Sequence, residues 1–97
     1  MNEYGVSMLI KVSELKALPG KRLKLVFSDG ASAITDLSRL IEQGGPMVAA
    51  LADDAYFARV FLEAGAPTWP NGFDLAPWAL HADLKAAGKL EPASQSV

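Results

Sequence analysis

The only histidine of the chain, His81, is the first residue to consider for acid–base chemistry. A histidine that acts as a general base needs a carboxylate to orient its ring, and the nearest acid in sequence, Asp83, lies on a different side of the expected helix. As a metal ligand, His81 would be alone among carboxylates. The sequence therefore predicts a half-exposed histidine with a passive surface role.

The other groups with chemical potential have structural explanations. Asp53 and Asp54 precede an expected short helix, where carboxylates cap free N–H groups and favour the positive end of the helix dipole. The candidate nucleophiles Ser13, Ser28 and Ser38 have no histidine in a recognisable arrangement. The chain has no cysteine, no glycine-rich phosphate or dinucleotide motif and no calcium loop. We therefore predict no catalytic residue, no cofactor and no metal ligand.

A group of basic residues is a stronger candidate for binding. Lys11 falls on the polar side of the first expected strand, and Arg22 and Lys24 fall on the polar side of the second. If these strands pair, three cations share one face of a sheet and can contact an acidic partner protein or phosphate groups. The alternative is an ordinary solvated face, because no aromatic residues interleave for base stacking and the net charge is −2.

The loop "WPNGFD" is the second binding candidate. We expect the aromatic residues around it, Trp69, Trp78, Phe73, Tyr56 and Phe57, either to close the core over the end of the sheet or to leave a tryptophan exposed as an anchor for a partner. Packing in the core is the favoured interpretation, because a domain of this size can seldom spare two tryptophans.

The elements that position these residues begin with strands. Val6, Met8, Ile10 and Val12 alternate with more polar residues, and the phase slips at Ser13–Glu14, which predicts a bulge. Pro19–Gly20 predicts a type II turn.

The hairpin that follows is expected to turn at Asp29–Gly30 through a two-residue type I′ loop. In this register Leu25 lies opposite Ile34, and both side chains face the core.

Helices and two short strands complete the pattern. Asp36 is expected to cap a helix that ends at Gly44–Gly45, where Pro46 prevents continuation. Strands are expected at 59–65 and 67–69, and Asn71–Gly72 then redirects the chain into a last helix. Asp74 is predicted to cap that helix, Pro77 to lie in its first turn and Gly88 to end it, with Ala76, Leu80 and Leu84 forming its apolar stripe.

Composition and order of elements indicate the fold class. The 97 residues are 51% hydrophobic and 21% charged, as in a globular domain, and no apolar run is long enough to cross a bilayer. The start of the chain lacks the features of a signal peptide, so a cytoplasmic location is expected. We predict one α+β domain at 1–90, with an antiparallel sheet of about four or five strands packed against the C-terminal helix, and a mobile tail at 91–97.

Several spaced motifs resemble those of a family of small bacterial proteins known as a domain of unknown function. The motifs are "LPGKRLKLVFSDG", "DLSRLIEQGG", "DDAYFARV" and "WPNGFDLAPWAL", in that order. The resemblance implies a compact α+β domain with no established enzymatic activity. Similar domains sometimes carry a helix-turn-helix segment, and often belong to toxin–antitoxin-like gene pairs. The chain ends soon after Leu90, so no such DNA-binding extension is expected here.

These observations favour a non-enzymatic protein-interaction module, the antitoxin-like member of a two-gene pair. The expected partner is another small protein, contacted through Lys11, Arg22, Lys24, Trp69, Asn71, Phe73 and Asp74. One alternative is an enzyme or small-ligand binder with a pocket between the "WPNG" loop and the sheet, using Asp74 or Asp36. Another is a nucleic-acid-binding accessory domain that uses the basic strands.

Overall fold

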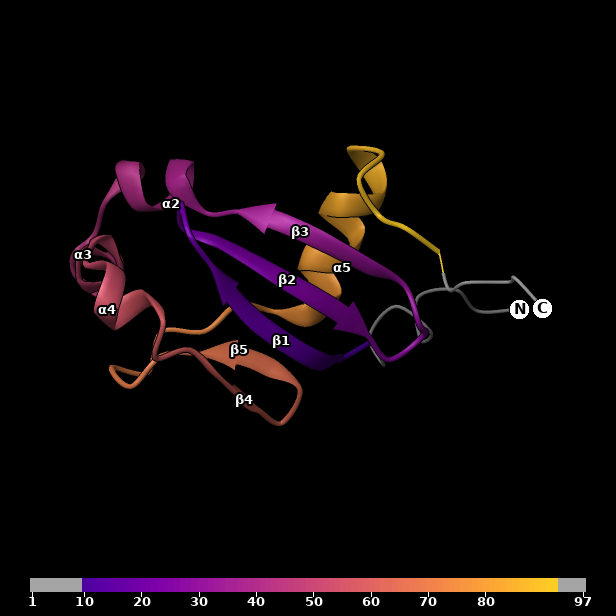
Figure 1. The fold of residues 1–97 in the computed structure, drawn as a ribbon, viewed down its shortest axis with the longest axis horizontal. Helices are drawn as coiled ribbons and strands as arrows, with labels where there is room; N and C mark the ends of the chain where they lie inside the picture. The colour runs from indigo at the N-terminus through magenta and orange to yellow at the C-terminus, as the bar shows by residue number, and fades with distance from the viewer. Residues whose placement is uncertain (1–9, 93–97) are drawn as a thin grey trace.

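The computed structural model describes residues 10–92 and has the α+β architecture that the sequence predicts. Three antiparallel strands form a sheet in the order β1–β2–β3, with α5 across one face and the β4–β5 hairpin beside β1 (Figure 1). The short helices gather beyond the end of the sheet where β2 begins. The elements are β1 (Val12–Leu18), β2 (Arg22–Phe27), β3 (Ser32–Asp36), α2 (Ser38–Gln43), α3 (Pro46–Ala49), the 3-10 turn η1 (Ala50–Ala52), α4 (Asp54–Phe57), β4 (Phe61–Glu63), β5 (Ala66–Thr68) and α5 (Pro77–Ala86).

The predicted bulge in the first strand is confirmed. The β1–β2 register shifts between Val12 and Glu14, which leaves Ser13 as the extra residue. Gly20 in the β1–β2 turn has φ 82°, as the third residue of a type II turn requires. The predicted alternation at residues 6–8 lies outside the described residues.

The predicted register of the β2–β3 hairpin is wrong by one residue. The N–H of Phe27 donates to the carbonyl of Ala31, so the loop has three residues rather than two. Leu25 therefore lies opposite Ala33, and Ile34 lies opposite Lys24. Because side chains alternate across a strand, this shift turns Ile34 outward, and it is 47% exposed.

The side chain of Asp29 explains the longer loop. Its Oδ1 accepts the N–H of Ala31 at 2.9 Å, and the N–H of Gly30 donates to the carbonyl of Phe27. This is the three-residue loop in which glycine follows a tight turn at positive φ, and Gly30 has φ 88°. The inner face of β3 therefore carries only the small side chain of Ala33 and the partly buried Thr35, which lie opposite Leu25 and Leu23.

The core lies between the inner face of the sheet and the elements packed on it. Leu23, Leu25 and Phe27 of β2 are buried, and Leu84 of α5 joins them. Each such side chain stabilises the fold by about 1.5–3 kcal/mol when it leaves water. Ile10, Val12, Ala33 and Leu37 add buried side chains from the first and third strands and their ends. The short helices and the loop before α5 contribute Val48, Leu51, Phe57 and Trp69.

The helix ends agree with the sequence in part. Helix α2 ends before Gly44–Gly45 as predicted. The predicted cap at Asp36 is wrong, because Leu37 occupies the N-cap position, and Asp36, one residue earlier, accepts the N–H of Ser38 at 2.8 Å. Pro46, however, does not end helical structure, because it starts α3 at the first-turn position that tolerates proline. Asp53 caps α4 as predicted by accepting the N–H of Tyr56 at 3.0 Å.

The predicted cap of the last helix is wrong. Ala76, not Asp74, occupies the N-cap position of α5, and no side chain caps the helix there. Pro77 lies in the first turn, as predicted. Gly88 ends the helix with φ 73°, while the N–H of Lys89 donates to the carbonyl of Leu84 as in a Schellman motif.

Asp74 instead directly follows a second turn, Trp69–Phe73, which has the same hydrogen bonds as the turn Phe27–Ala31. The N–H of Trp69 donates to the carbonyl of Phe73 and the N–H of Gly72 donates to the carbonyl of Trp69, each at 2.9 Å. Asp74 then pairs with Thr68 in an antiparallel bridge. The prediction that Asn71–Gly72 only redirects the chain is therefore wrong, since this segment closes a short hairpin.

Strand β4 is shorter than the sequence predicts, β5 begins one residue earlier than predicted, and the turn between them also lies earlier. Ala64 and Gly65 connect them, with φ 53° and 83°. Both values are positive, as in the two-residue turn that the sequence predicts at Asp29–Gly30.

Candidate functional site

The exposed face of the three-stranded sheet is the strongest candidate surface. We define the outer face by its three cross-strand rows: Glu14, Val26 and Ser32; Lys16, Lys24 and Ile34; and Leu18, Arg22 and Asp36. Helix α5 packs on the opposite side of the sheet (Figure 1). Lys16, Lys24 and Ile34 are all exposed, and they form the middle row of this face.

Two like charges lie side by side in that row. Lys16 is directly opposite Lys24, and neither lysine forms an ion pair with another residue in the range 10–92. Like charges in this position destabilise a sheet by about 0.2–1 kcal/mol. The middle row therefore concentrates positive charge that no carboxylate within residues 10–92 pairs with directly, although Glu14 and Glu91 lie in the neighbouring depressions.

The next row is compensated. Arg22 lies opposite Asp36, and its Nε donates to the carbonyl of Pro19 at 2.9 Å. Hydrogen bonds from Ser38, more than Arg22, hold the pKa of Asp36 below its usual value, against a small opposing effect of burial. The depression that Asp36 lines contains no residue of the Trp69–Asp74 segment.

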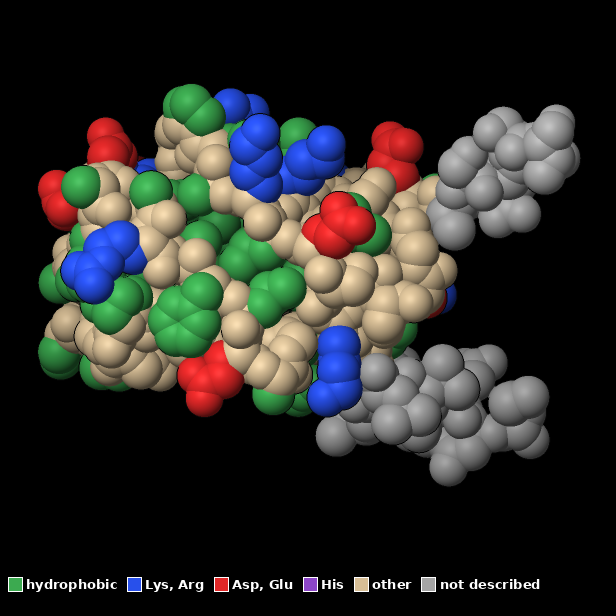
Figure 2. Space-filling model, turned by 60° about the horizontal axis from the view of Figure 1, so that its bottom comes forward, with side chains coloured by type: hydrophobic (Ala, Val, Ile, Leu, Met, Phe, Trp, Pro, Cys, Tyr) green, Lys and Arg blue, Asp and Glu red, His purple; other side chains and the backbone are tan. Residues whose placement is uncertain are grey.

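Lys24 forms part of the wall of two depressions on the outer face. The larger, of about 440 Å³, is lined by Lys24, Ser32, Ala33, Ile34, Lys89 and Glu91. The smaller, of about 140 Å³, is lined by Glu14, Leu15, Lys16, Lys24 and Val26. Figure 2 shows neighbouring Lys and Arg side chains above a band of hydrophobic side chains. The surface thus offers cations next to apolar area.

Lys11 does not lie beside Arg22 and Lys24 as the sequence predicts. Its backbone bonds to Ser28, at the far end of β2 from Arg22. Its side chain packs on Gly65, where an added Cβ would be 2.6 Å from the Lys11 Cβ, and its Nζ donates to the carbonyl of Ala64 at 3.5 Å. Beyond the bulge it is Lys16 that faces Lys24.

The favoured interpretation of Trp69 as a core residue is confirmed. Its side chain is 0% exposed, and its Nε1 donates to the carbonyl of Phe57 at 2.9 Å. The rings of Phe57 and Phe73 flank it, with centroids at 5.8 and 5.9 Å. Trp69 therefore cannot touch a partner directly. The prediction of a core position is wrong for Trp78, which is 45% exposed.

Asn71 fastens the same loop to the short helices. Its Oδ1 accepts the N–H of Phe73, its Nδ2 donates to the carbonyl of Met47 at 2.9 Å, and its own N–H donates to the Tyr56 hydroxyl at 2.8 Å. Phe73 is half-buried and Asp74 is exposed. The polar groups of Asn71 are thus used within the chain, and Asp74 has the more accessible side chain.

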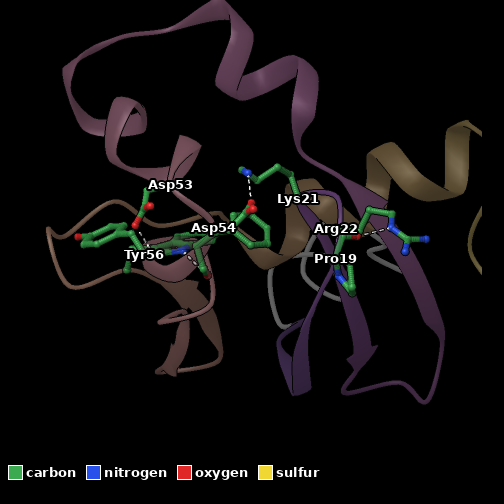
Figure 3. A network of polar contacts seen from close by, with 8 residues as sticks. Pro19, Lys21, Arg22, Asp53, Asp54 and Tyr56 are labelled. Carbon is green, nitrogen blue, oxygen red and sulfur yellow. Dashed lines mark hydrogen bonds and ion pairs between the residues drawn. The ribbon is translucent and has the colours of Figure 1, made fainter.

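The two acidic residues at the start of α4 make two different contacts (Figure 3). Asp53 caps the helix, whereas Asp54 forms an ion pair with Lys21 in the β1–β2 turn. Lys21 has a positive φ of 60°, which is uncommon for a residue with a side chain. The capping prediction holds for Asp53, and the contact of Asp54 depends on a residue 33 positions away.

His81 has a partner that the sequence does not reveal. Its Nε2 lies 2.9 Å from Oδ2 of Asp29, and its ring meets the edge of the Phe27 ring at a centroid distance of 5.0 Å. The side chain is 16% exposed, so it is less accessible than predicted. The neighbouring depression, lined by Asp29, Ala31, His81, Lys85, Leu90 and Pro92, has no hydroxyl or thiol in its wall. The pair therefore links α5 to the hairpin.

The Asp29 carboxylate responds to this setting. Partial burial raises its pKa, but the Ala31 N–H and the contact with His81 outweigh that effect and leave the pKa below its usual value. The charged form of Asp29 is thus favoured by folding.

The described part of the chain has neither a cluster of metal ligands nor a helix that could span a membrane. Within residues 10–92 no group of three or more His, Asp or Glu side chains is arranged to hold a metal ion. No helix in the same range has the length and hydrophobicity to cross a bilayer. The predicted tail lies largely outside this range, although Glu91 exchanges two backbone hydrogen bonds with Ser32.

Comparison with known proteins gives one result. No curated protein and no solved structure matches the chain. Residues 12–86, which include the sheet, both three-residue turns and α5, match the model of the family described as Protein of unknown function (DUF2442), and the chain belongs to this family.

Proposed function

We propose that this protein is an interaction module that binds an acidic surface of another small protein through its outer face. The observation that carries this proposal is the Lys16–Lys24 pair, which forms no ion pair within residues 10–92 and lies beside the exposed side chain of Ile34. A carboxylate placed between the two ammonium groups would turn a repulsion of about 0.2–1 kcal/mol into two attractions. Burial of Ile34 would add a hydrophobic contribution of at most about 1.5–3 kcal/mol.

The same proposal includes a biological setting. We infer that the protein is the antitoxin-like member of a bacterial two-gene pair and acts in the cytoplasm without catalysing a reaction. Membership in a family that is described without an activity is compatible with this inference.

Co-expression with the product of the neighbouring gene tests the proposal. A tagged chain should retain that product during purification, and the double variant Lys16→Glu/Lys24→Glu should lose it. Lys85→Glu is the matched control, because Lys85 is an exposed lysine of α5, the helix packed on the opposite side of the sheet. Retention by the double variant, or equal loss with Lys85→Glu, would refute the role of the outer face.

Nucleic acid is the competing ligand for the same cations. In that case affinity for a DNA duplex should fall steeply with added salt, because phosphate contacts release counterions. The outer face has no aromatic side chain for base stacking, which favours the protein partner. Salt-sensitive DNA binding that the double variant abolishes would replace our proposal with this one.

A further inference from the structure

We infer that the outer edge of β3 binds an extended segment of the partner as an additional strand. This inference rests on the proposed function and specifies how the partner contacts the sheet. The segment would carry a large apolar side chain beside Ile34 and an acidic side chain toward Lys24 and Lys89. Main-chain hydrogen bonds supply much of the affinity in this mode of recognition.

The phase of the β2–β3 ladder places free backbone groups on this edge. Phe27 bonds to Ala31, so Ala33 and Thr35 are the β3 residues that face β2 through their N–H and C=O groups. The intervening residues, Ile34 and Asp36, direct these groups away from β2. Within residues 10–92, no backbone hydrogen bond to another element involves the N–H or C=O of Ile34.

The chain itself shows that this edge accepts extended backbone. Ser32 has the same phase as Ile34, and it exchanges two hydrogen bonds of 2.8 Å with Glu91. The following position is left open because the N–H of Lys89 turns back to Leu84 at the end of α5. Ile34 is therefore the next site of a ladder that Glu91 begins.

The free backbone groups of Ile34 lie next to a depression in the surface that carries excess positive charge. The depression of about 440 Å³ lies between Ile34, Lys24, Lys89 and Glu91, and it holds two ammonium groups against one carboxylate. A second depression, of about 500 Å³, continues from Lys89 and carries balanced charge, with Asp36 and Glu42 against Arg39 and Lys89. The excess of positive charge is thus confined to the first depression, whose lining an extended segment with acidic and apolar side chains matches better than a basic one.

A second copy of the chain fits the edge less well. Symmetric antiparallel pairing of two β3 strands at Ile34 and Asp36 would place Ser38 of one copy opposite Ser32 of the other. Glu91 already occupies that position. A slender segment does not meet this obstacle.

Peptide selection on the full-length chain tests the inference. A phage library of random linear peptides is selected against the protein, and the consensus peptide is synthesised with a single N-methyl group at each position in turn. In an added strand only alternate N–H groups face the edge, so methylation should weaken binding at every second position by about fivefold to tenfold. Uniform tolerance of methylation, or selection of no binding peptide, would overturn the inference.

Two protein variants complete the test. Ile34→Pro removes the edge N–H, while Ile34→Thr retains it and also loses the apolar side chain. The proline variant should bind the peptide at least about fivefold more weakly than the threonine variant. If circular dichroism shows that Ile34→Pro is unfolded, the methylation pattern decides.

The same peptide separates this inference from the proposed function. Loss of binding in Lys16→Glu/Lys24→Glu without the alternating methylation pattern would support the outer face and reject strand addition. The alternating pattern with unchanged binding in the double variant would support strand addition and reject the charged row. If the double variant binds the peptide normally and methylation shows no alternating pattern, both the proposed function and the strand addition are rejected.

Discussion

The turns Phe27–Ala31 and Trp69–Phe73 have the same backbone hydrogen bonds but different surroundings. In each, the first residue donates its N–H to the fifth, the fourth donates to the first, and an Asx side chain at the third position accepts the N–H of the fifth. The sequences "FSDGA" and "WPNGF" thus encode one loop geometry twice.

The third residue differs because its second polar atom meets a different partner. In the first turn Oδ2 of Asp29 meets His81, which can donate a hydrogen bond. In the second turn Nδ2 of Asn71 meets the carbonyl of Met47, which can only accept one. The choice between aspartate and asparagine therefore follows from a contact that is distant in sequence.

Replacement of Trp69, the first residue of the second turn, should give the largest effect on stability. Trp69→Ala removes a fully buried ring and the hydrogen bond from its Nε1 to the Phe57 carbonyl, so unfolding free energy should fall by about 3–5 kcal/mol. Urea denaturation followed by circular dichroism measures this change. Trp78→Ala, at the exposed tryptophan, should change stability by about 0.5 kcal/mol or less. Similar losses in both variants would contradict the burial difference.

The glycines at the fourth positions test whether the turns are equivalent. Gly30 and Gly72 have φ 88° and 92°, so alanine at either position should cost about 1–2 kcal/mol. An added Cβ at Gly72 meets only Met47 Cε at 3.9 Å, so backbone strain dominates there. Equal losses of unfolding free energy in urea denaturation would show that the two turns are equivalent. A clear difference between the two variants would show that they are not.

Exchange of the Asx residues should reveal their different partners. Asn71→Asp places a carboxylate oxygen against the Met47 carbonyl and should cost about 1 kcal/mol at neutral pH. Asp29→Asn keeps the acceptor for Ala31 and changes only the contact with His81, so its cost should be smaller. A larger loss in Asp29→Asn would show that the His81 contact outweighs the contact with Met47.

Of the two turns, only the first contains a residue that titrates in acid, so only the first should contribute to the loss of stability at low pH. The pKa of Asp29 is lower in the folded state than its usual value of 3.8, so its charged form favours folding. This contribution is fully present above pH 3.8 and is lost as pH falls through the folded pKa. Denaturation midpoints measured downward from neutral pH should therefore decline less in Asp29→Asn than in the wild type. Asn71→Ala provides the control, since an amide does not titrate, and the acid decline should persist in that variant.

A third turn gives the smallest expected effect. Ala64 has φ 53° in the two-residue β4–β5 turn, so Ala64→Gly relieves strain but increases the freedom of the unfolded chain. A net stabilisation of about 0.5 kcal/mol or less should appear as a slightly higher midpoint in urea. A lower midpoint would show that the turn is not strained at Ala64.

Features set by near neighbours could be predicted from the sequence. The bulge at Ser13, the end of α2 at Gly44–Gly45, the cap at Asp53 and the end of α5 at Gly88 depend on interactions within a few residues. The alternation of Leu23, Leu25 and Phe27 likewise identified the buried side of β2. These local patterns, in their order along the chain, were sufficient for the α+β class.

Tertiary structure decided what depends on partners far along the chain. Asp29–Gly30 suits both two- and three-residue loops, and the one-residue difference turned Ile34 from the core to the outer face. Contacts over 33 and 52 positions joined Lys21 to Asp54 and Asp29 to His81, for which sequence spacing gives no signal. The bulge and the β4–β5 turn separated Lys11 from Lys24 and left Lys16 in its place. The sequence by itself thus determined which segments form strands, turns and helices, because those preferences are local. Only packing and register decided which charges share a surface.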